Sequence, residues 1–252
     1  MNRLTSVSGS LGLEFSSQQV SQAVAPRRGR RRAPVRPTDE GVSFFAPVHY
    51  ERNYAYPLLV WLHDDHGNER QLRQVMPHVS MRNYLAVAVR ATRPSEREQH
   101  GFVWRQSAEA VRQAAEQVRD AIDEASERFH VHPDRVFIAG HRRGGTMALR
   151  LGLRYPEWFA GAISLCGPMP EGDAPLARVN DARELPLLIA STQECSLYPD
   201  QRVAADLRLL HSAGFTLALR HYPGDCDLTT EMLSDVDRWV MAQFCGSSMA
   251  AS

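Results

Sequence analysis

The sequence predicts an α/β protein with a mostly parallel, twisted sheet and helices on both faces. Short apolar runs typical of buried strands alternate along the chain with longer helical patterns, and this alternation is typical of strand–helix–strand units. The chain has 252 residues, of which 43% are hydrophobic, enough for one such domain with a tail. In such a sheet, ligands bind beyond the carboxyl ends of the strands.

The domain begins near Val42. Segments 56–63 and 84–90 are near-continuous apolar runs, as expected for strands covered on both faces. Between residues 106 and 129, apolar residues recur at helical spacing with charges between them, which predicts a long helix. An apolar, β-prone segment follows at 135–139.

The second half of the domain continues the same alternation. We predict, in order, a helix at 144–154, strands at 161–166 and 186–190, a helix at 199–212, a strand at 215–222 and a last helix at 230–244. Residues 42–246 are therefore predicted to form one domain.

The N-terminal segment differs from the domain in composition. Residues 1–40 contain seven arginines and three acidic residues, a net charge of +4, and few large apolar side chains. Such a segment buries too little apolar surface to offset its ordering entropy, so we predict a disordered basic tail. Its arginine-rich run is compatible with nucleic acid or acidic lipid, but no aromatic residues interleave to stack on bases, so we favour a solvated tail. Residues 247–252 are also predicted to be disordered.

Bulk properties narrow the class of protein further. The formal net charge is zero, and the four cysteines have neither metal-binding nor redox spacing. The N-terminus lacks the apolar region of a secretory signal, and no apolar run is long enough to form a transmembrane segment. We expect a cytoplasmic protein with reduced cysteines, no metal ion and no cofactor.

A candidate catalytic turn lies between the segment 135–139 and the predicted helix after it. Its sequence is Gly140-His141-Arg142-Arg143-Gly144. A strand, a sharp turn and a helix form the context of a nucleophile elbow, in which Gly-x-Ser-x-Gly lifts a serine above the sheet edge. Here the central residue is Arg142, whose guanidinium stays protonated and cannot attack an acyl carbon. The sequence thus predicts a catalytic scaffold without its usual nucleophile.

An ordered series of motifs accompanies this turn. They are segments 58–63, 144–149, 154–161, 163–168 and 222–224. Together they resemble the phospholipase/carboxylesterase branch of the α/β-hydrolase superfamily, which includes acyl-protein thioesterase-like enzymes, and the resemblance covers residues 42–245. It implies the α/β-hydrolase fold and an ester or thioester hydrolase that uses Ser, Asp and His in that chain order.

The resemblance implies a residue at each catalytic position. Arg142 stands at the nucleophile position. The acid follows segment 186–190 in a pattern like Gly-x-x-Asp-x-x-x-Pro, and the nearest carboxylate is Glu194, which is either the acid or an exposed loop residue. Cys226 stands at the base position after Tyr-Pro-Gly. An ordinary thiol, with a pKa near 8.5, is a poor proton shuttle at neutral pH.

The oxyanion loop is altered as well. Where the family has a pattern like His-Gly-x-Gly-Gly, this chain has His63-Asp64-Asp65-His66-Gly67. Carboxylates beside the amides oppose the stabilisation of a developing negative charge. The resemblance implies that His63 braces this loop.

Two hypotheses follow for Arg142. In the leading one, the guanidinium meets Asp64, Asp65, Glu194 or Asp227 in a salt-bridge network that fills the old site. In the competing one, Arg142 and Arg143 begin a helix whose N-terminus binds a small acyl or anionic ligand.

The predicted function is that of an inactive pseudo-esterase with a binding or regulatory role. The alternative is a residual carboxylic-ester or thioester hydrolase with a non-standard nucleophile, for which Cys226 or Thr146 is the candidate. Cys195 and Cys226 lie on the two loops that bring acid and base together. We favour two unpaired thiols over a disulfide there.

Overall fold

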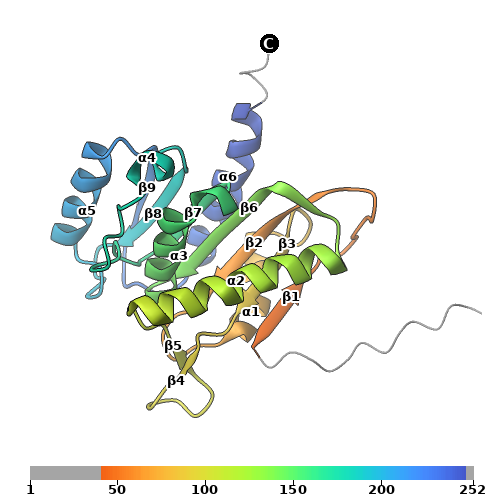
Figure 1. Cartoon of the computed structure of the whole chain (residues 1–252), viewed down its shortest axis with the longest axis horizontal. Helices are drawn as coiled ribbons and strands as arrows, with labels where there is room; N and C mark the ends of the chain where they lie inside the picture. The colour runs from red at the N-terminus through yellow and green to blue at the C-terminus, as the bar shows by residue number, and fades with distance from the viewer. Residues whose placement is uncertain (1–40, 248–252) are drawn as a thin grey trace, which may run out of the picture. The chain divides into compact units, whose positions relative to one another are not determined.

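The computed structural model describes residues 41–247 (Figure 1). The basic tail predicted for residues 1–40 and most of the C-terminal segment predicted to be disordered lie outside the described residues. Among the described residues, no helix is long and apolar enough to cross a membrane.

A seven-stranded sheet forms the centre of the described domain, in the order β1-β3-β2-β6-β7-β8-β9. Only the edge strand β1 is antiparallel to its neighbour, and all other pairs in this sheet are parallel. The strands are β1 (Val42–Phe45), β2 (Tyr56–Leu62), β3 (Leu85–Val89), β6 (Val131–His141), β7 (Gly161–Leu165), β8 (Leu187–Thr192) and β9 (Leu217–Tyr222). A separate two-stranded pair consists of β4 (Arg93–Pro94) and β5 (Phe102–Val103).

Helices cover both faces of the sheet, as predicted. Helix α2 packs on α3 and β3, whereas α1 packs on α6. In Figure 1, α2 and α3 lie in front of the sheet and α1 and α6 lie behind it. The helices are α1 (Leu72–Val79), α2 (Ala108–Arg128), α3 (Arg143–Arg154), α4 (Val179–Ala182), α5 (Asp200–Ser212) and α6 (Thr230–Ser247), with 3-10 turns at Glu69–Gln71 and Pro156–Trp158.

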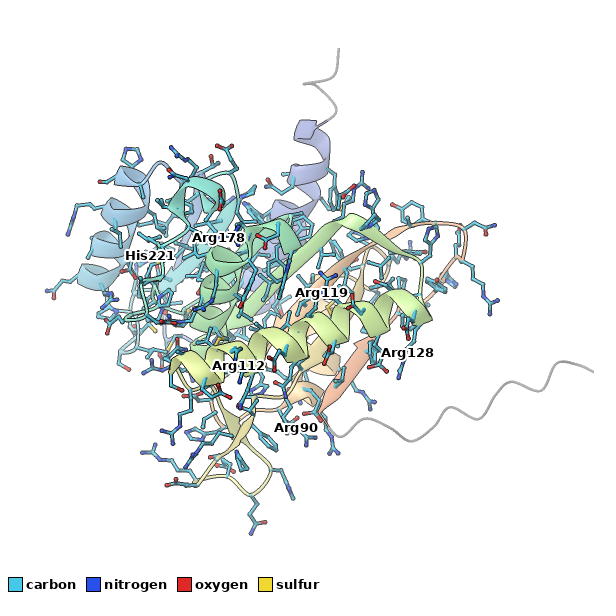
Figure 2. All side chains as sticks on the ribbon, viewed as in Figure 1. Arg90, Arg112, Arg119, Arg128, Arg178 and His221 are labelled. Carbon is cyan, nitrogen blue, oxygen red and sulfur yellow. The ribbon has the colours of Figure 1, made fainter. Side chains whose placement is uncertain are left out.

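The apolar patterns account for most of these elements. All residues of β2 and β3 are buried, which explains why both segments are continuously apolar. The long helix α2 begins after Ser107, whose hydroxyl accepts a bond from the Ala110 amide at 3.4 Å. Arg112, Arg119 and Arg128 lie along the solvent face of α2 (Figure 2). This helix therefore has one polar and one apolar face.

The helix α1 was not predicted. Its eight residues include Pro77, which has no amide hydrogen to donate, and a proline in a sequence usually indicates a break in a helix. Four apolar side chains of α1 are nevertheless buried, so tertiary packing decides its conformation.

Two glycines let α3 approach the sheet without a side chain between them. A Cβ added to Gly140 would lie 2.3 Å from the Gly144 carbonyl oxygen, and one added to Gly144 would lie 2.2 Å from the Leu62 carbonyl oxygen. The start of α3 therefore rests directly on the carboxyl ends of β2 and β6. This contact leaves a single residue, Arg142, for the turn between β6 and α3.

We expect Gly144→Ala to lower the free energy of unfolding by about 3 kcal/mol or more, because the added methyl meets backbone atoms that cannot rotate away. Gly214→Asn is the matched control. Gly214 has a φ of 82° with open space around it, and asparagine tolerates that conformation, so we expect a change below about 1 kcal/mol. Urea unfolding measures both, and equal effects of the two substitutions would contradict the packing argument.

Candidate active site

The turn between β6 and α3 has the backbone of a strained elbow. Arg142 has φ 47° and ψ −113°, a conformation that residues with a Cβ rarely adopt. Two backbone bonds hold the turn. The Arg142 amide donates to the Leu165 carbonyl at 2.7 Å, and the Thr146 amide donates to the Arg142 carbonyl at 3.0 Å. The predicted elbow is therefore present, with an arginine at its apex.

The Arg142 side chain lies among acceptors from two other loops. Its Nη1 donates to Asp64 Oδ2 at 3.2 Å, and its Nη2 donates to Asp227 Oδ1 at 3.0 Å. Its Nε donates to the Cys226 carbonyl at 3.1 Å. The Asp227 side chain is 84% exposed, whereas that of Asp64 is only 18% exposed, so Asp64 is the stronger partner.

Asp64 also binds the backbone amides that an oxyanion would use. Its Oδ1 accepts from the Asp65 amide at 2.7 Å and from the Arg143 amide at 3.4 Å. In an α/β-hydrolase elbow, the oxyanion hole consists of the amide after the nucleophile and an amide of the loop that follows an earlier strand. Arg143 follows the elbow apex, and Asp65 lies on the loop after β2. The chain thus places its own carboxylate at both amides.

His63 anchors the loop after β2 that carries Asp64. Its Nε2 accepts from the Ala91 amide at 3.0 Å, and its Nδ1 donates to the Asp64 carbonyl at 2.6 Å. The ring is fully buried beside Trp104, and burial lowers the pKa of His63 to about 4. A neutral imidazole with both nitrogens bonded to backbone groups supports the bracing role.

The two other predicted carboxylates do not reach Arg142 in the described structure. Asp65 turns towards the Trp104 amide, which donates to it at 3.0 Å, and burial raises its pKa. Glu194 is exposed, and its own amide bonds to the Gly224 carbonyl at 3.0 Å. Of the two interpretations of Glu194, the structure supports the exposed loop residue.

Cys195, rather than Glu194, lies beside Cys226. The two thiols are in contact, both residues are buried, and neither forms a disulfide. Burial, together with hydrogen bonding to Cys195, raises the pKa of Cys226 to about 12. The sequence contained a signal for Cys195: it stands four residues before Pro199, where the family pattern places its acid.

Hydrogen bonds from the elbow also hold the backbone of the loop that carries Cys226. His141 Nε2 lies 2.7 Å from the Cys226 carbonyl oxygen, which also accepts from Arg142. Burial lowers the pKa of His141, so the ring is neutral and donates through Nε2.

The second candidate for a non-standard nucleophile, Thr146, is buried, and its hydroxyl donates to the Pro168 carbonyl at 2.9 Å. Among the described residues, no group of acidic, cysteine or histidine side chains is arranged to hold a metal ion.

The sheet order, the elbow and the flanking helices define an α/β-hydrolase fold. Solved structures agree. The carboxylesterase of Bacillus cereus superposes with a TM-score of 0.63 at 17% identity, covering 80% of this chain and 93% of that one. The carboxylesterase of Mesorhizobium loti gives 0.64 at 20% identity, covering 75% and 90%. Arabidopsis thaliana SOBER1 gives 0.61 at 20% identity, covering 75% and 100%.

Sequence comparison identifies the family. The model of the esterase family described as "Putative esterase" matches residues 36–206, and the chain belongs to this family. It is 41% identical over 66 residues to "Putative esterase NocK" of Nocardia uniformis subsp. tsuyamanensis, a match over 26% of this chain and 18% of that protein. It is 26% identical over 115 residues to acyl-protein thioesterase 1 of Gibberella zeae, over 44% and 49%. The chain thus matches at most half the length of these relatives.

We expect Asp64→Ala to lower the free energy of unfolding by about 2 kcal/mol, because it leaves two amides without their acceptor and removes the less exposed carboxylate partner of a half-buried guanidinium. Asp227→Ala removes the exposed partner of the same guanidinium and is expected to change stability by less than about 1 kcal/mol. Urea unfolding of both variants tests this difference. A larger loss in Asp227→Ala would show that Asp64 is not the main partner.

The buried His63 also predicts a pH dependence. Its pKa is about 4 in the folded chain, below its usual value near 6.5, so the unfolded chain binds the proton more tightly. Stability from this group is complete above pH 6.5 and is lost as the pH falls towards 4, by about 3 kcal/mol in total. His63→Gln should flatten this part of the profile, whereas Gln in place of the exposed His211 should not. Identical profiles for the two variants would contradict the assignment.

Proposed function

We propose that this member of the esterase family is catalytically inactive, a pseudo-esterase with a binding or regulatory role. The observation that carries the proposal is the Asp64 carboxylate, which is hydrogen-bonded to the Asp65 and Arg143 amides and paired with Arg142. An internal anion at these amides competes with the tetrahedral intermediate of acyl transfer, which would have to place its own oxyanion there.

The remaining chemistry supports the same conclusion. Acyl transfer on this fold needs a nucleophile at the elbow apex, a base within its reach and an acid that orients the base. The apex is Arg142, and the loops implied for base and acid bring Cys226 and Cys195 together. A guanidinium and two buried thiols supply neither the nucleophile nor the proton shuttle.

The alternative is a residual ester or thioester hydrolase with a non-standard nucleophile. Its support is the likeness to acyl-protein thioesterase 1 over about half of that protein. Cys226 is disfavoured because the thiolate is the nucleophile, and with a pKa of about 12 little of it forms at neutral pH. Thr146 is disfavoured because its hydroxyl is buried and already donates to a carbonyl.

Binding of an anionic ligand at Arg142 and Arg143 is disfavoured for a related reason. Both the guanidinium of Arg142 and the amide of Arg143 already have the Asp64 carboxylate as acceptor. An external anion would have to displace this carboxylate and overcome its charge. A binding role therefore requires another part of the molecule.

We expect the purified protein to hydrolyse p-nitrophenyl butyrate and an acyl thioester no faster than the protein-free buffer. Arg142→Ser should remain inactive, because Asp64 still occupies the amides and the base is still a thiol. The combined variant with Asp64→Gly, Arg142→Ser, Cys195→Asp and Cys226→His supplies a nucleophile, base, acid and open amides. It is expected to hydrolyse the ester measurably, which shows that the assay detects catalysis on this fold.

Saturable turnover by the unmodified protein would overturn the proposal. Loss of that turnover in Cys226→Ala would assign it to the alternative thiol mechanism. Retention in Cys226→Ala and loss in Thr146→Val would assign it to the threonine.

A further inference from the structure

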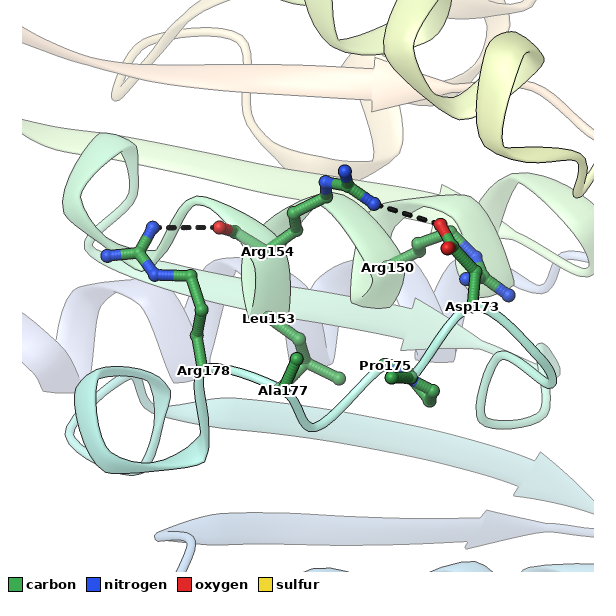
Figure 3. A pocket seen from close by; sticks show the side chains of 8 residues that line it. Arg150, Leu153, Arg154, Asp173, Pro175, Ala177 and Arg178 are labelled. Carbon is green, nitrogen blue, oxygen red and sulfur yellow. Dashed lines mark hydrogen bonds and ion pairs between the residues drawn. The ribbon is translucent and has the colours of Figure 1, made fainter.

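A second site lies farther along α3, away from the elbow. Arg150 follows Arg142 by eight residues, which corresponds to roughly 12 Å along the helix axis. It lines a pocket of about 310 Å³ between α3 and the segment that leads to α4, hereafter the Arg150 pocket (Figure 3). The lining includes the charged residues Arg150, Arg154, Asp173 and Arg178 and the apolar residues Leu153 and Pro175.

Arg150 is a buried cation without a carboxylate in ion-pair contact. The residue is only 2% exposed, and among the described residues no acidic group lies within ion-pair distance of it. Three neutral oxygens accept its bonds: Gln106 Oε1 at 2.8 Å, the Gly172 carbonyl at 3.2 Å and the Glu171 carbonyl at 2.5 Å. A guanidinium has five N–H groups, so two are left to donate. Buried charges are normally paired with an opposite charge. Burial also lowers the pKa of Arg150, because it disfavours the charged guanidinium.

The other two arginines of the pocket differ from Arg150, because each has an acidic partner. Arg154 pairs with Asp173 at 2.9 Å, and Arg178 pairs with Glu157 at 3.0 Å and with Asp181 at 3.1 Å (Figure 3 shows the first of these pairs). With three arginines and one aspartate, the lining is cationic. Arg150 has no such contact: Asp173 acts on it only at longer range and is already paired with Arg154.

A strained segment shapes the wall of the pocket. Gly172, Asp173 and Ala174 are three consecutive residues with positive φ, at 69°, 49° and 42°. Two of these residues have a Cβ and adopt the conformation at an energetic cost, and such strain is concentrated at binding and catalytic sites. The segment presents the carbonyls of Glu171 and Gly172 to Arg150 and places the Asp173 carboxylate at the pocket.

We propose that the Arg150 pocket binds a small organic monocarboxylate with a short apolar body. One negative charge compensates Arg150, and a carboxylate matches the planar fork of a guanidinium. Leu153 and Pro175 offer an apolar surface for the rest of the ligand. The volume is at the lower end of the range for ligand pockets, ~300–1,000 Å³, which favours a ligand of a few carbon atoms. This site requires no activity of the elbow.

Titration calorimetry with hexanoate and with its neutral isostere hexanamide tests the proposal. We expect saturable binding of hexanoate, about tenfold or more tighter than that of hexanamide, because only the acid supplies a charge-assisted bond to Arg150. Phenyl phosphate and benzoate form a second pair. Binding of the phosphate without binding of either carboxylate would overturn the assignment of a monocarboxylate.

Three variants on the solvent side leave Arg150 and its bonds intact. Ala177→Trp fills the exposed rim of the pocket and should abolish binding. Asp173→Asn removes the carboxylate that repels the ligand and frees Arg154 from its ion pair, so it should tighten binding severalfold. Asparagine tolerates the positive φ at this position. Arg112→Gln on the solvent face of α2 removes a charge elsewhere and should have no effect.

Three results would each overturn the proposal: no saturable heat up to about 10 mM hexanoate, equal affinities for the acid and the amide, or unchanged binding in Ala177→Trp. None of these measurements depends on ester hydrolysis. A negative result here therefore leaves the pseudo-esterase proposal standing, and turnover in the ester assay leaves this one standing.

Discussion

The direct contact between the first turn of α3 and the ends of β2 and β6 determines the rest of the site. Because Gly140 and Gly144 have no side chains, only one residue separates the end of the strand from the start of the helix. That residue, Arg142, must then adopt the strained elbow conformation. The same contact brings the loop after β2 to the helix N-terminus, where Asp64 reaches the Arg143 amide. Backbone packing thus fixes the elbow whichever side chain stands at its apex.

The electrostatics of the cleft follow from this geometry. Amides at a helix N-terminus attract an anion, and in this chain the anion is covalently part of the loop. Arg142 then neutralises Asp64, and the exposed Asp227 adds a second, weaker partner. His63 stays neutral at neutral pH because burial lowers its pKa to about 4, so it adds no charge. The charges of the cleft therefore compensate one another in direct contact, whereas Arg150 farther along α3 has no carboxylate in contact.

Sequence was sufficient for the parallel sheet, the main helices and the elbow, because apolar periodicity and glycine spacing encode them directly. It also predicted that the Arg142 side chain pairs with carboxylates. Of the four candidate carboxylates, the structure places two, Asp64 and Asp227, in contact with it. The choice depends on side-chain direction: Asp65 turns to the Trp104 amide, and Glu194 lies on the outside of its loop. The Arg150 pocket has no sequence signal, since its wall forms from a loop whose positive φ values only the fold imposes.

The residues of the cleft depend on one another, and this interdependence supports the proposal that the chain is catalytically inactive. A serine placed at position 142 would leave the Asp64 carboxylate at the amides without Arg142 as its counterion, so this single substitution makes the site more anionic rather than more catalytic. Removing the Asp64 carboxylate alone would leave Arg142 as a half-buried cation with only the exposed Asp227 as an acidic partner. Because Arg142 and Asp64 compensate each other, the electrostatics oppose a change of either one alone, and the strained elbow holds the cation of this ion pair. Under the proposed function, a binding role falls to another part of the molecule, and the Arg150 pocket, whose buried guanidinium has no carboxylate in contact, is the part of the described structure that we propose for it.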